Sequence, residues 1–89
     1  MSEPKDCPAF VEVKLSKPFV VNGVSMLTLR LREPTAGDQK IAIRTPGTDK
    51  DREAVLFANL LEVSVSDIDR LPLRDIQRIS KAFDTNFFD

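Results

Sequence analysis

The chain of 89 residues contains no histidine, no tyrosine and no tryptophan, and its one cysteine is Cys7. Without histidine, a conventional Cys-His or Ser-His catalytic pair is excluded. A lone cysteine forms no disulfide within the chain, so we interpret Cys7 as an incidental thiol in a loose tail and expect a reducing compartment. No apolar run approaches the length of a membrane span, and the N-terminus lacks the core of a signal peptide. The sequence therefore predicts a cytoplasmic protein without membrane segments.

Recognisable ligand clusters are also missing. Asp67, Asp69 and Asp75 are close in sequence but lack the glycine and the closing glutamate of a calcium loop, so we interpret them as acids that cap helices or complement helix dipoles. The segment "TPGTDKD" lacks the repeated glycines and the Lys-Ser/Thr ending of a phosphate loop, and it predicts a turn between helices. We therefore expect no enzyme, no metal and no cofactor, and a binding role becomes the default.

The charge balance gives little support to nucleic-acid binding. The formal net charge is -1, whereas sequence-independent binding to nucleic acid depends on an excess of positive charge that neutralises phosphates. Arg74, Arg78 and Lys81 fall on one helical stripe, but Asp75 and Asp84 dilute it. A small regulatory nucleic-acid-binding domain, or a generic protein-interaction domain, remains the alternative hypothesis.

The first part of the chain has the pattern of a β-hairpin. Apolar and charged residues alternate from Phe10 to Leu15, which is the period of a strand with one buried face. Lys17-Pro18 interrupts this strand before Phe19-Val20-Val21. Asn22-Gly23 is the dipeptide best suited to a tight turn, and the return strand is then Val24 to Leu31.

The register of this hairpin presents a conflict. The return strand has three alternating leucines that we expect on one side, Leu27, Leu29 and Leu31. A strict two-residue loop at Asn22-Gly23 would put Val13 and Leu15 on the opposite face. Because a shift of one residue exchanges the faces, we predict either a three-residue loop with Gly23 in a bulge or a bulge at residues 16–18.

Helices follow the hairpin. In "LREPTAGD" Pro34 ends the strand and Thr35 can cap a helix over Ala36 to Arg44 that carries Ile41 and Ile43. Thr48 or Asp49 can cap a second helix, Lys50 to Glu62, whose apolar centre should lie between the sheet and another helix. Ser66 and Asp69 predict the cap of a short helical turn before Pro72.

The last helix begins at Leu73 and is amphipathic, with its apolar side on Ile76, Ile79, Phe83 and Phe87. We expect this side to close the core over the second helix. The fold class predicted is α+β, with a small antiparallel hairpin sheet of two or three strands packed against three to four helices. Residues 1–9 are predicted to be a flexible tail, and residues 10–89 a single domain. Unpaired edges of so small a sheet favour a homo-oligomer.

The ending "FDTNFFD" is the sequence feature that a simple core does not explain. Phe83 and Phe87 lie one turn apart, whereas Phe88 projects off their face at a fraying helix end. One interpretation is that Phe87 and Phe88 simply cap the core. The other is that Phe83, Phe87 and Phe88 belong to a hydrophobic site for a partner.

The order of motifs carries a resemblance. A "V-x-L-x-K-P" strand at Val13 to Pro18, the Asn-Gly hairpin, "LREPTAGD", an apolar helix, "SVSDIDRLPLRD" and a Phe-rich terminal helix follow one another along nearly the whole chain. In this it resembles the tail assembly chaperones of contractile-tailed, Mu-like bacteriophages and prophages.

The resemblance implies a non-enzymatic protein of virion morphogenesis, active in the cytoplasm of the bacterial host. Its partners would be the tape measure protein, which it would hold in solution, and the tail tube subunits, which it would help to recruit. A small domain that exposes limited apolar surface can bind many segments of a long amphipathic helix weakly and gain avidity from many copies.

Overall fold

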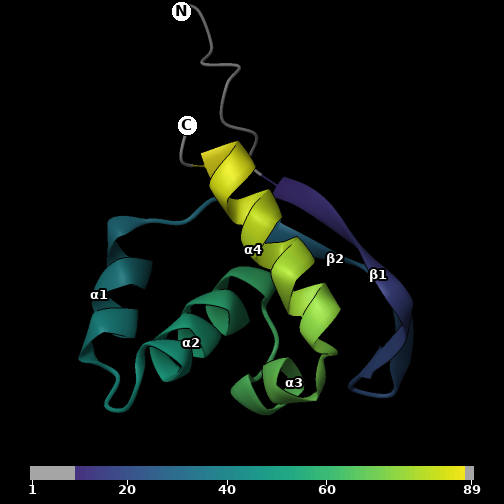
Figure 1. The fold of residues 1–89 in the computed structure, drawn as a ribbon, viewed down its shortest axis with the longest axis horizontal. Helices are drawn as coiled ribbons and strands as arrows, with labels where there is room; N and C mark the ends of the chain where they lie inside the picture. Colours follow the sequence, from purple (N-terminus) through teal and green to yellow (C-terminus); the bar gives the residue numbers. More distant parts are fainter. Residues whose placement is uncertain (1–9, 88–89) are drawn as a thin grey trace, which may run out of the picture.

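The computed structural model describes residues 10–87; the predicted tail of residues 1–9, which includes Cys7, and Phe88 lie outside the described residues. A two-stranded antiparallel hairpin is followed by four helices within this range, which confirms the α+β fold. In Figure 1 the hairpin lies on one side and α1 on the other, with α2 and α4 between them. The elements are β1 (Phe10–Val21), β2 (Val24–Arg32), α1 (Ala36–Arg44), α2 (Asp49–Leu61), α3 (Val65–Arg70) and α4 (Leu73–Phe87).

The hairpin has a two-residue loop together with a bulge. Asn22 and Gly23 both have positive φ angles, 52° and 80°, and Val21 pairs with Val24. Further along, the register shifts between Lys14 and Phe19, so that residues 15–18 of β1 stand opposite a single residue of β2. This is the second of the two predicted solutions. The bulge lets Val13 pair with Leu29, and β1 continues through Lys17-Pro18 as one strand.

The expectation that the three leucines of β2 share one side is wrong for the first of them. Leu29 and Leu31 are 3% and 0% exposed, whereas Leu27 is 61% exposed. Leu27 is the residue opposite the bulge, where the two registers meet. On the other side of the bulge the residue that packs against the core is Met26, an odd number of positions from Leu29, so β2 changes its inward face at this point.

Three side chains from α3 and α4 bind the backbone of β1. The buried carboxylate of Asp75 accepts hydrogen bonds from the Ser16 N–H at 2.9 Å and from the Ser16 hydroxyl at 3.0 Å. Arg78 donates to the carbonyl of Lys14 at 3.2 Å, and Arg70 donates to the carbonyl of Val20 at 3.0 Å. The Asp75 contact holds the bulge, because it satisfies a peptide group that the shifted register leaves without a partner on β2.

The strand-to-helix joint predicted from "LREPTAGD" is present with the predicted helix bounds. Thr35 caps α1, and the Thr35 N–H in turn donates to Asp38, which completes a capping box. The guanidinium of Arg32 forms two hydrogen bonds of 2.8 Å to the Asp38 carboxylate. This ion pair attaches the end of β2 to the first turn of α1. The two isoleucines that this helix carries, Ile41 and Ile43, are 50% and 63% exposed, and α1 buries Asp38 and Ala42 instead.

Capping boxes also begin the next two helices. Thr48, one of the two predicted caps, begins α2 and forms the box with Asp51, while Asp49 is the first residue of the helix. For α3 the predicted cap is wrong by two residues: Ser64 and Asp67 form the box, while Ser66 lies inside the helix. Ser64/Asp67 and Ser66/Asp69 both have the spacing of a capping box. The helix that starts at Val65 places Ile68 in the core.

One hydrophobic core joins the hairpin to the helices. α4 lies against β1, and its Phe83 ring meets the edge of Phe57 on α2, with ring centroids 5.7 Å apart in a T-shaped arrangement. α2 contacts β2 and α3 and, on its far side, α1. The apolar centre of α2 is therefore covered from several sides, as its composition predicted.

Candidate partner-binding site

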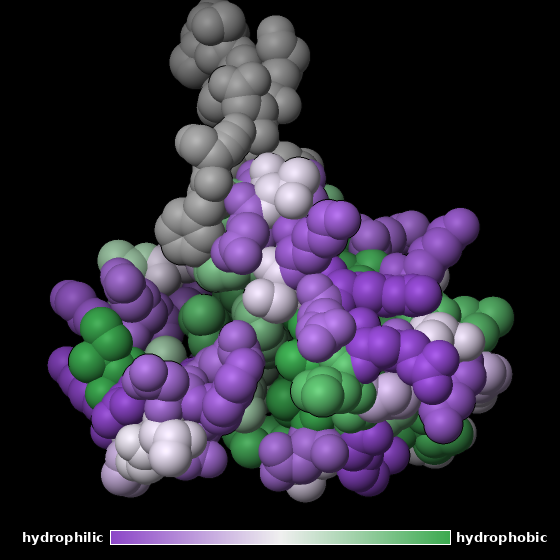
Figure 2. All heavy atoms as spheres, viewed as in Figure 1, coloured by the Kyte–Doolittle hydropathy of each residue, from purple (hydrophilic) through white to green (hydrophobic). Residues whose placement is uncertain are grey.

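A hollow of about 320 Å³ lies where α1, α2 and the C-terminal half of α4 come together. α1 stands apart from α4, and the Phe83 and Phe87 rings fill only part of the space between them. Figure 2 shows hydrophobic atoms between α1 and α4, bordered by hydrophilic side chains. The lining residues are Pro34, Thr35, Ala36, Gln39, Leu56, Phe83 and Phe87.

The wall of the hollow is aromatic and aliphatic. Phe83 is 9% exposed and packs against Phe57, while Phe87 is partly buried with its ring centroid 6.1 Å from that of Phe83. Leu56, on α2, is also partly buried. The two polar lining side chains, Thr35 and Gln39, are uncharged. The hollow is therefore suited to apolar side chains, with hydrogen-bonding groups on the α1 side.

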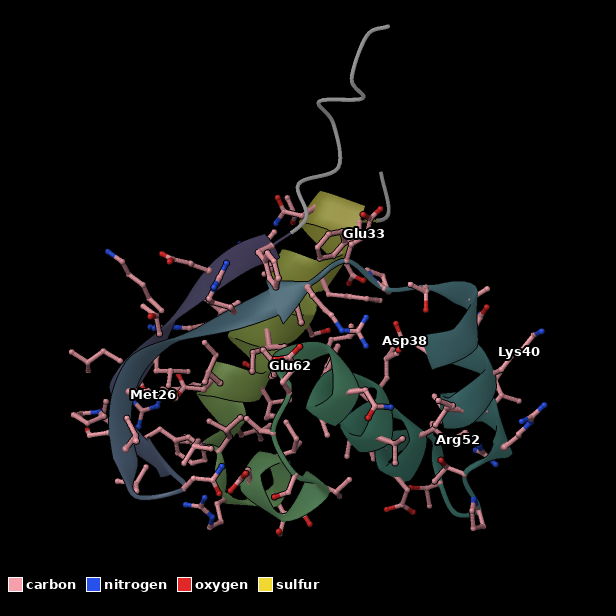
Figure 3. All side chains as sticks on the ribbon, turned by 180° about the vertical axis from the view of Figure 1, so that it is seen from behind. Met26, Glu33, Asp38, Lys40, Arg52 and Glu62 are labelled. Atoms are coloured by element: carbon pink, nitrogen blue, oxygen red, sulfur yellow. The ribbon has the colours of Figure 1, made fainter. Side chains whose placement is uncertain are left out.

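A partly buried ion pair, Arg32–Asp38, lies beside the α1 wall of the hollow. The Arg32 guanidinium, together with hydrogen bonds from the N–H and hydroxyl of Thr35, holds the pKa of the Asp38 carboxyl well below its usual range, against the opposing effect of burial. In Figure 3 Asp38 lies on the inner side of α1 and Lys40 points outward. Because Asp38 stays ionised and paired, it positions α1 and leaves the hollow itself without a free charge.

The structure brings two of the three predicted site residues together. Phe83 and Phe87 lie side by side and line the hollow. Phe83 is mainly a core residue, because it is almost fully covered, and Phe87 offers more surface to a partner. The third, Phe88, lies outside the described residues, so its part in the site stays a prediction.

Sequence reasoning missed the opposite wall. Pro34, Thr35 and Ala36 were interpreted as a joint between a strand and a helix, and they also form the rim that faces Phe87. Leu56 was interpreted only as a core residue of α2. The signal available in the sequence was the abrupt joint itself, but its nearness to α4 depends on the packing of α1 on α2.

The other sequence candidates have structural contacts. Asp67 caps α3, and the Ser64 N–H and Arg70 lower the pKa of its carboxyl. Asp75 binds Ser16. Over residues 10–87, the carboxylates form no group of three that could hold a metal ion. Of the basic stripe, Arg78 bonds to the backbone of β1.

A family model supplies the comparison that identifies the chain. The model described as "Phage tail assembly chaperone proteins, E, or 41 or 14" matches residues 12–87, which include all but the first two residues of the hairpin, the four helices and the hollow. The chain belongs to this family. Comparisons with curated proteins and with solved structures gave no match.

Membership gives this tail assembly chaperone its role in outline. It takes part in the assembly of phage tails, and its family is one of chaperones rather than of enzymes. A chaperone acts through surfaces that bind other proteins, which agrees with a hollow of apolar side chains at the end of α4. None of the helices within residues 10–87 is both long and apolar enough to cross a lipid bilayer.

Proposed function

We propose that this chaperone binds the tape measure protein through the hollow between α1, α2 and α4, and that it helps to recruit tail tube subunits. Phe83 and Phe87 on α4, together with Phe88 after it in the sequence, are the binding residues, with Pro34 and Leu56 opposite Phe87. The setting is the cytoplasm of the bacterial host, during assembly of a contractile, Mu-like tail, and residues 10–89 act as a single domain.

The observation that carries the proposal is the uncharged hollow at the Phe-rich end of α4. Its volume of about 320 Å³ is at the lower end of the range for ligand pockets, roughly 300–1,000 Å³. It therefore fits a few apolar side chains rather than a whole helix. An amphipathic helix that lays one apolar face across α1 and α4 could insert such side chains at helical spacing.

Weak binding at many points is suited to keeping a long tape measure protein in solution. A long helical tape measure has many apolar faces, and each would need protection until tube subunits cover it. A small hollow gives modest affinity at any one face, and several chaperones along one target then hold it in solution and leave easily.

The test is co-expression with a candidate tape measure protein from the neighbouring reading frames. We expect the two proteins to co-purify in soluble form. Phe87→Ser removes a wall of the hollow, and Ala36→Glu places a charge over it at a helix N-terminus that tolerates acids, so each should weaken binding about tenfold or more.

Leu73→Ser is the matched control. Leu73 is on the same helix as Phe87 but is 73% exposed at the opposite end, away from the hollow, so its substitution should leave binding unchanged. Circular dichroism checks that each variant is folded. If all three variants bind like the parent, the hollow is not the site; if no neighbouring tape measure protein binds at all, the proposed partner is wrong.

A further inference from the structure

The two edges of the hairpin differ in whether side chains form hydrogen bonds with their backbone groups. Along β1, the peptide groups of Lys14, Ser16 and Val20 are bound by Arg78, Asp75 and Arg70. Across residues 10–87, no side chain forms a hydrogen bond with the backbone of β2, which pairs with β1 on one side and with no strand on the other. One edge of the sheet is therefore closed and the other is open.

The open edge also lacks the features by which proteins usually protect an edge strand. Proline, lysine and inward-facing charges all discourage the addition of another strand. The segment from Val24 to Leu29 is "VSMLTL", in which every residue is uncharged and none is proline. Because Val21 and Val24 flank a two-residue loop as a hydrogen-bonded pair, Ser25 belongs to a non-hydrogen-bonded pair and its N–H faces the free edge.

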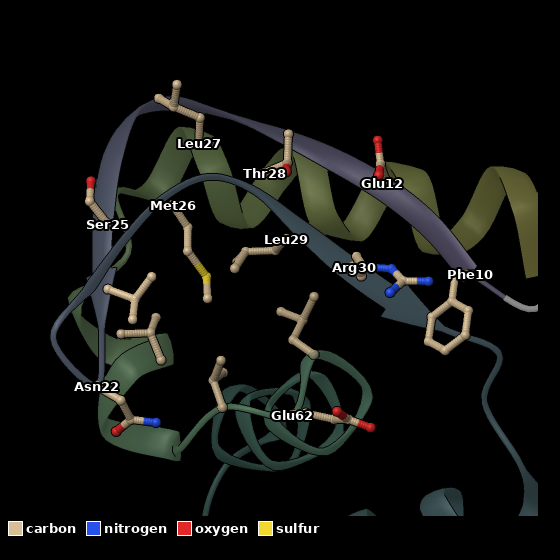
Figure 4. Close-up of a pocket in the computed structure, with 14 residues that line it drawn as sticks. Phe10, Glu12, Asn22, Ser25, Met26, Leu27, Thr28, Leu29, Arg30 and Glu62 are labelled. Carbon is tan, nitrogen blue, oxygen red and sulfur yellow. The ribbon is translucent and has the colours of Figure 1, made fainter.

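A second hollow runs beneath this edge. It lies within the curve of the hairpin, with the end of α2 and the two residues after it forming the floor. In Figure 4 Met26 and Leu29 point into it, whereas Leu27 and Thr28 lie on the other face of the strand. Leu61 and Val63 add apolar surface from below, and Val24 is 56% exposed. A strand added to β2 would cover these side chains.

We propose that β2 pairs with β2 of a second copy of this chain, antiparallel about a two-fold axis near Met26, so that the two hairpins form one four-stranded sheet. The charge pattern points to a second copy. Centred on Met26, the pairing places Ser25 opposite Leu27 of the other copy, and it ends before Thr28, which lies on the same face of β2 as Leu27. All charged residues of the hairpin stay outside the paired segment, so no like charges oppose each other.

This dimer goes beyond the chaperone function proposed above and does not use the same surface. The open edge and its hollow are formed by β1, β2 and the end of α2, whereas the hollow beside Phe87 lies between α1, α2 and α4. In such a dimer the hollow beside Phe87 stays accessible on each copy. One particle then offers two of these apolar sites to a long target.

Sedimentation equilibrium of the full chain, from about 5 to 500 µM, tests the pairing. We expect a reversible monomer–dimer equilibrium. Leu27→Lys places two ammonium groups close together across the axis and should weaken the dimer about tenfold or more, while Ser25→Pro removes an edge N–H and should do the same. A mixture of Leu27→Lys and Leu27→Glu chains should restore dimers, because opposite charges then meet.

Val20→Lys is the matched control for Leu27→Lys. Val20 is an exposed apolar residue of the same hairpin, 50% exposed, but it lies on β1, whose edge is closed. We expect it to dimerise like the parent. The proposal is overturned by a parent chain that stays monomeric at the highest concentration, by dimers that survive both β2 substitutions, or by an edge that pairs with a strand of a tail protein instead.

Discussion

Asp38 shows how much one acidic residue does in this fold. Asp38 is 6% exposed. Its carboxylate accepts hydrogen bonds from Arg32, from the Thr35 N–H and from the Thr35 hydroxyl. Sequence reasoning explained the same residue as a capping-box acid, which is correct but incomplete. The sequence does not say which arginine of β2 pairs with Asp38, because Arg30 lies two positions before Arg32 in the same alternating pattern.

We expect Asp38→Asn to lower the free energy of unfolding at pH 7 by about 2–3 kcal/mol, because Arg32 then keeps a partly buried charge without its partner. Urea unfolding followed by circular dichroism measures this. Asp49→Asn is the control: the Asp49 side chain is fully exposed, and its ion pair with Arg52 lies on the surface.

The pH dependence of that difference follows from the lowered pKa of Asp38. The unfolded chain binds a proton at this carboxyl near its ordinary pKa of about 3.9, whereas the folded chain resists protonation to lower pH. The stabilisation is therefore complete well above pH 4 and is lost as the pH falls below it. A difference between parent and Asp38→Asn that stayed constant down to pH 3 would contradict this assignment.

At the scale of elements, the contact between α4 and the bulge of β1 determines how the hairpin is built. The Asp75 carboxylate is 1% exposed and binds the N–H and the hydroxyl of Ser16, 59 positions away in the sequence. The local pattern predicted this bulge as one of two solutions, since a regular two-residue hairpin would separate the apolar faces. It did not predict what holds the bulge, because Asp75 also fits the role of a first-turn acid.

Asp75→Ala should lower the free energy of unfolding by about 2–3 kcal/mol, since it leaves a partly buried peptide N–H without an acceptor. Asp75→Asn should cost less, because its amide oxygen can still accept from Ser16. Thermal unfolding of both, beside Asp84→Ala at an exposed position of the same helix, separates the contact from a general effect of helix charge. An Asp75→Ala variant as stable as Asp84→Ala would show that the contact is unimportant.

For the whole molecule, the core is small and its aromatic contact is central. Phe57 is 2% exposed and meets Phe83 edge to face, joining α2 to α4. Domains of this size are usually stable by only about 5–10 kcal/mol, so the loss of one large core side chain removes much of the margin.

Phe57→Ala should cost about 3–5 kcal/mol and leave the protein unfolded or nearly so at 37 °C. Phe57→Leu keeps most of the volume and should still fold, and Leu73→Ala, at a largely exposed position, should unfold like the parent. Thermal scans by circular dichroism distinguish the three. A sharp transition of Phe57→Ala at the temperature of the parent would mean that the core does not depend on this ring.

What the sequence alone determined is the part governed by short-range chemistry. The positive φ angles at Asn22-Gly23, the capping residues Thr35 and Thr48, and the period of α4 are all set by hydrogen bonds and side-chain spacing within a few positions. For this reason the α+β order and most element bounds were predictable to within a residue or two.

The tertiary structure decided the rest, because burial depends on which elements meet. It selected Ser64 over Ser66 as the cap of α3, exposed Leu27 and Ile43, and joined Asp75 to Ser16. It also placed the joint at Pro34 beside Phe87, which turned a C-terminal cluster of phenylalanines into one wall of a hollow. Such a surface requires residues from three elements to converge, and that convergence is a property of packing that no local pattern contains.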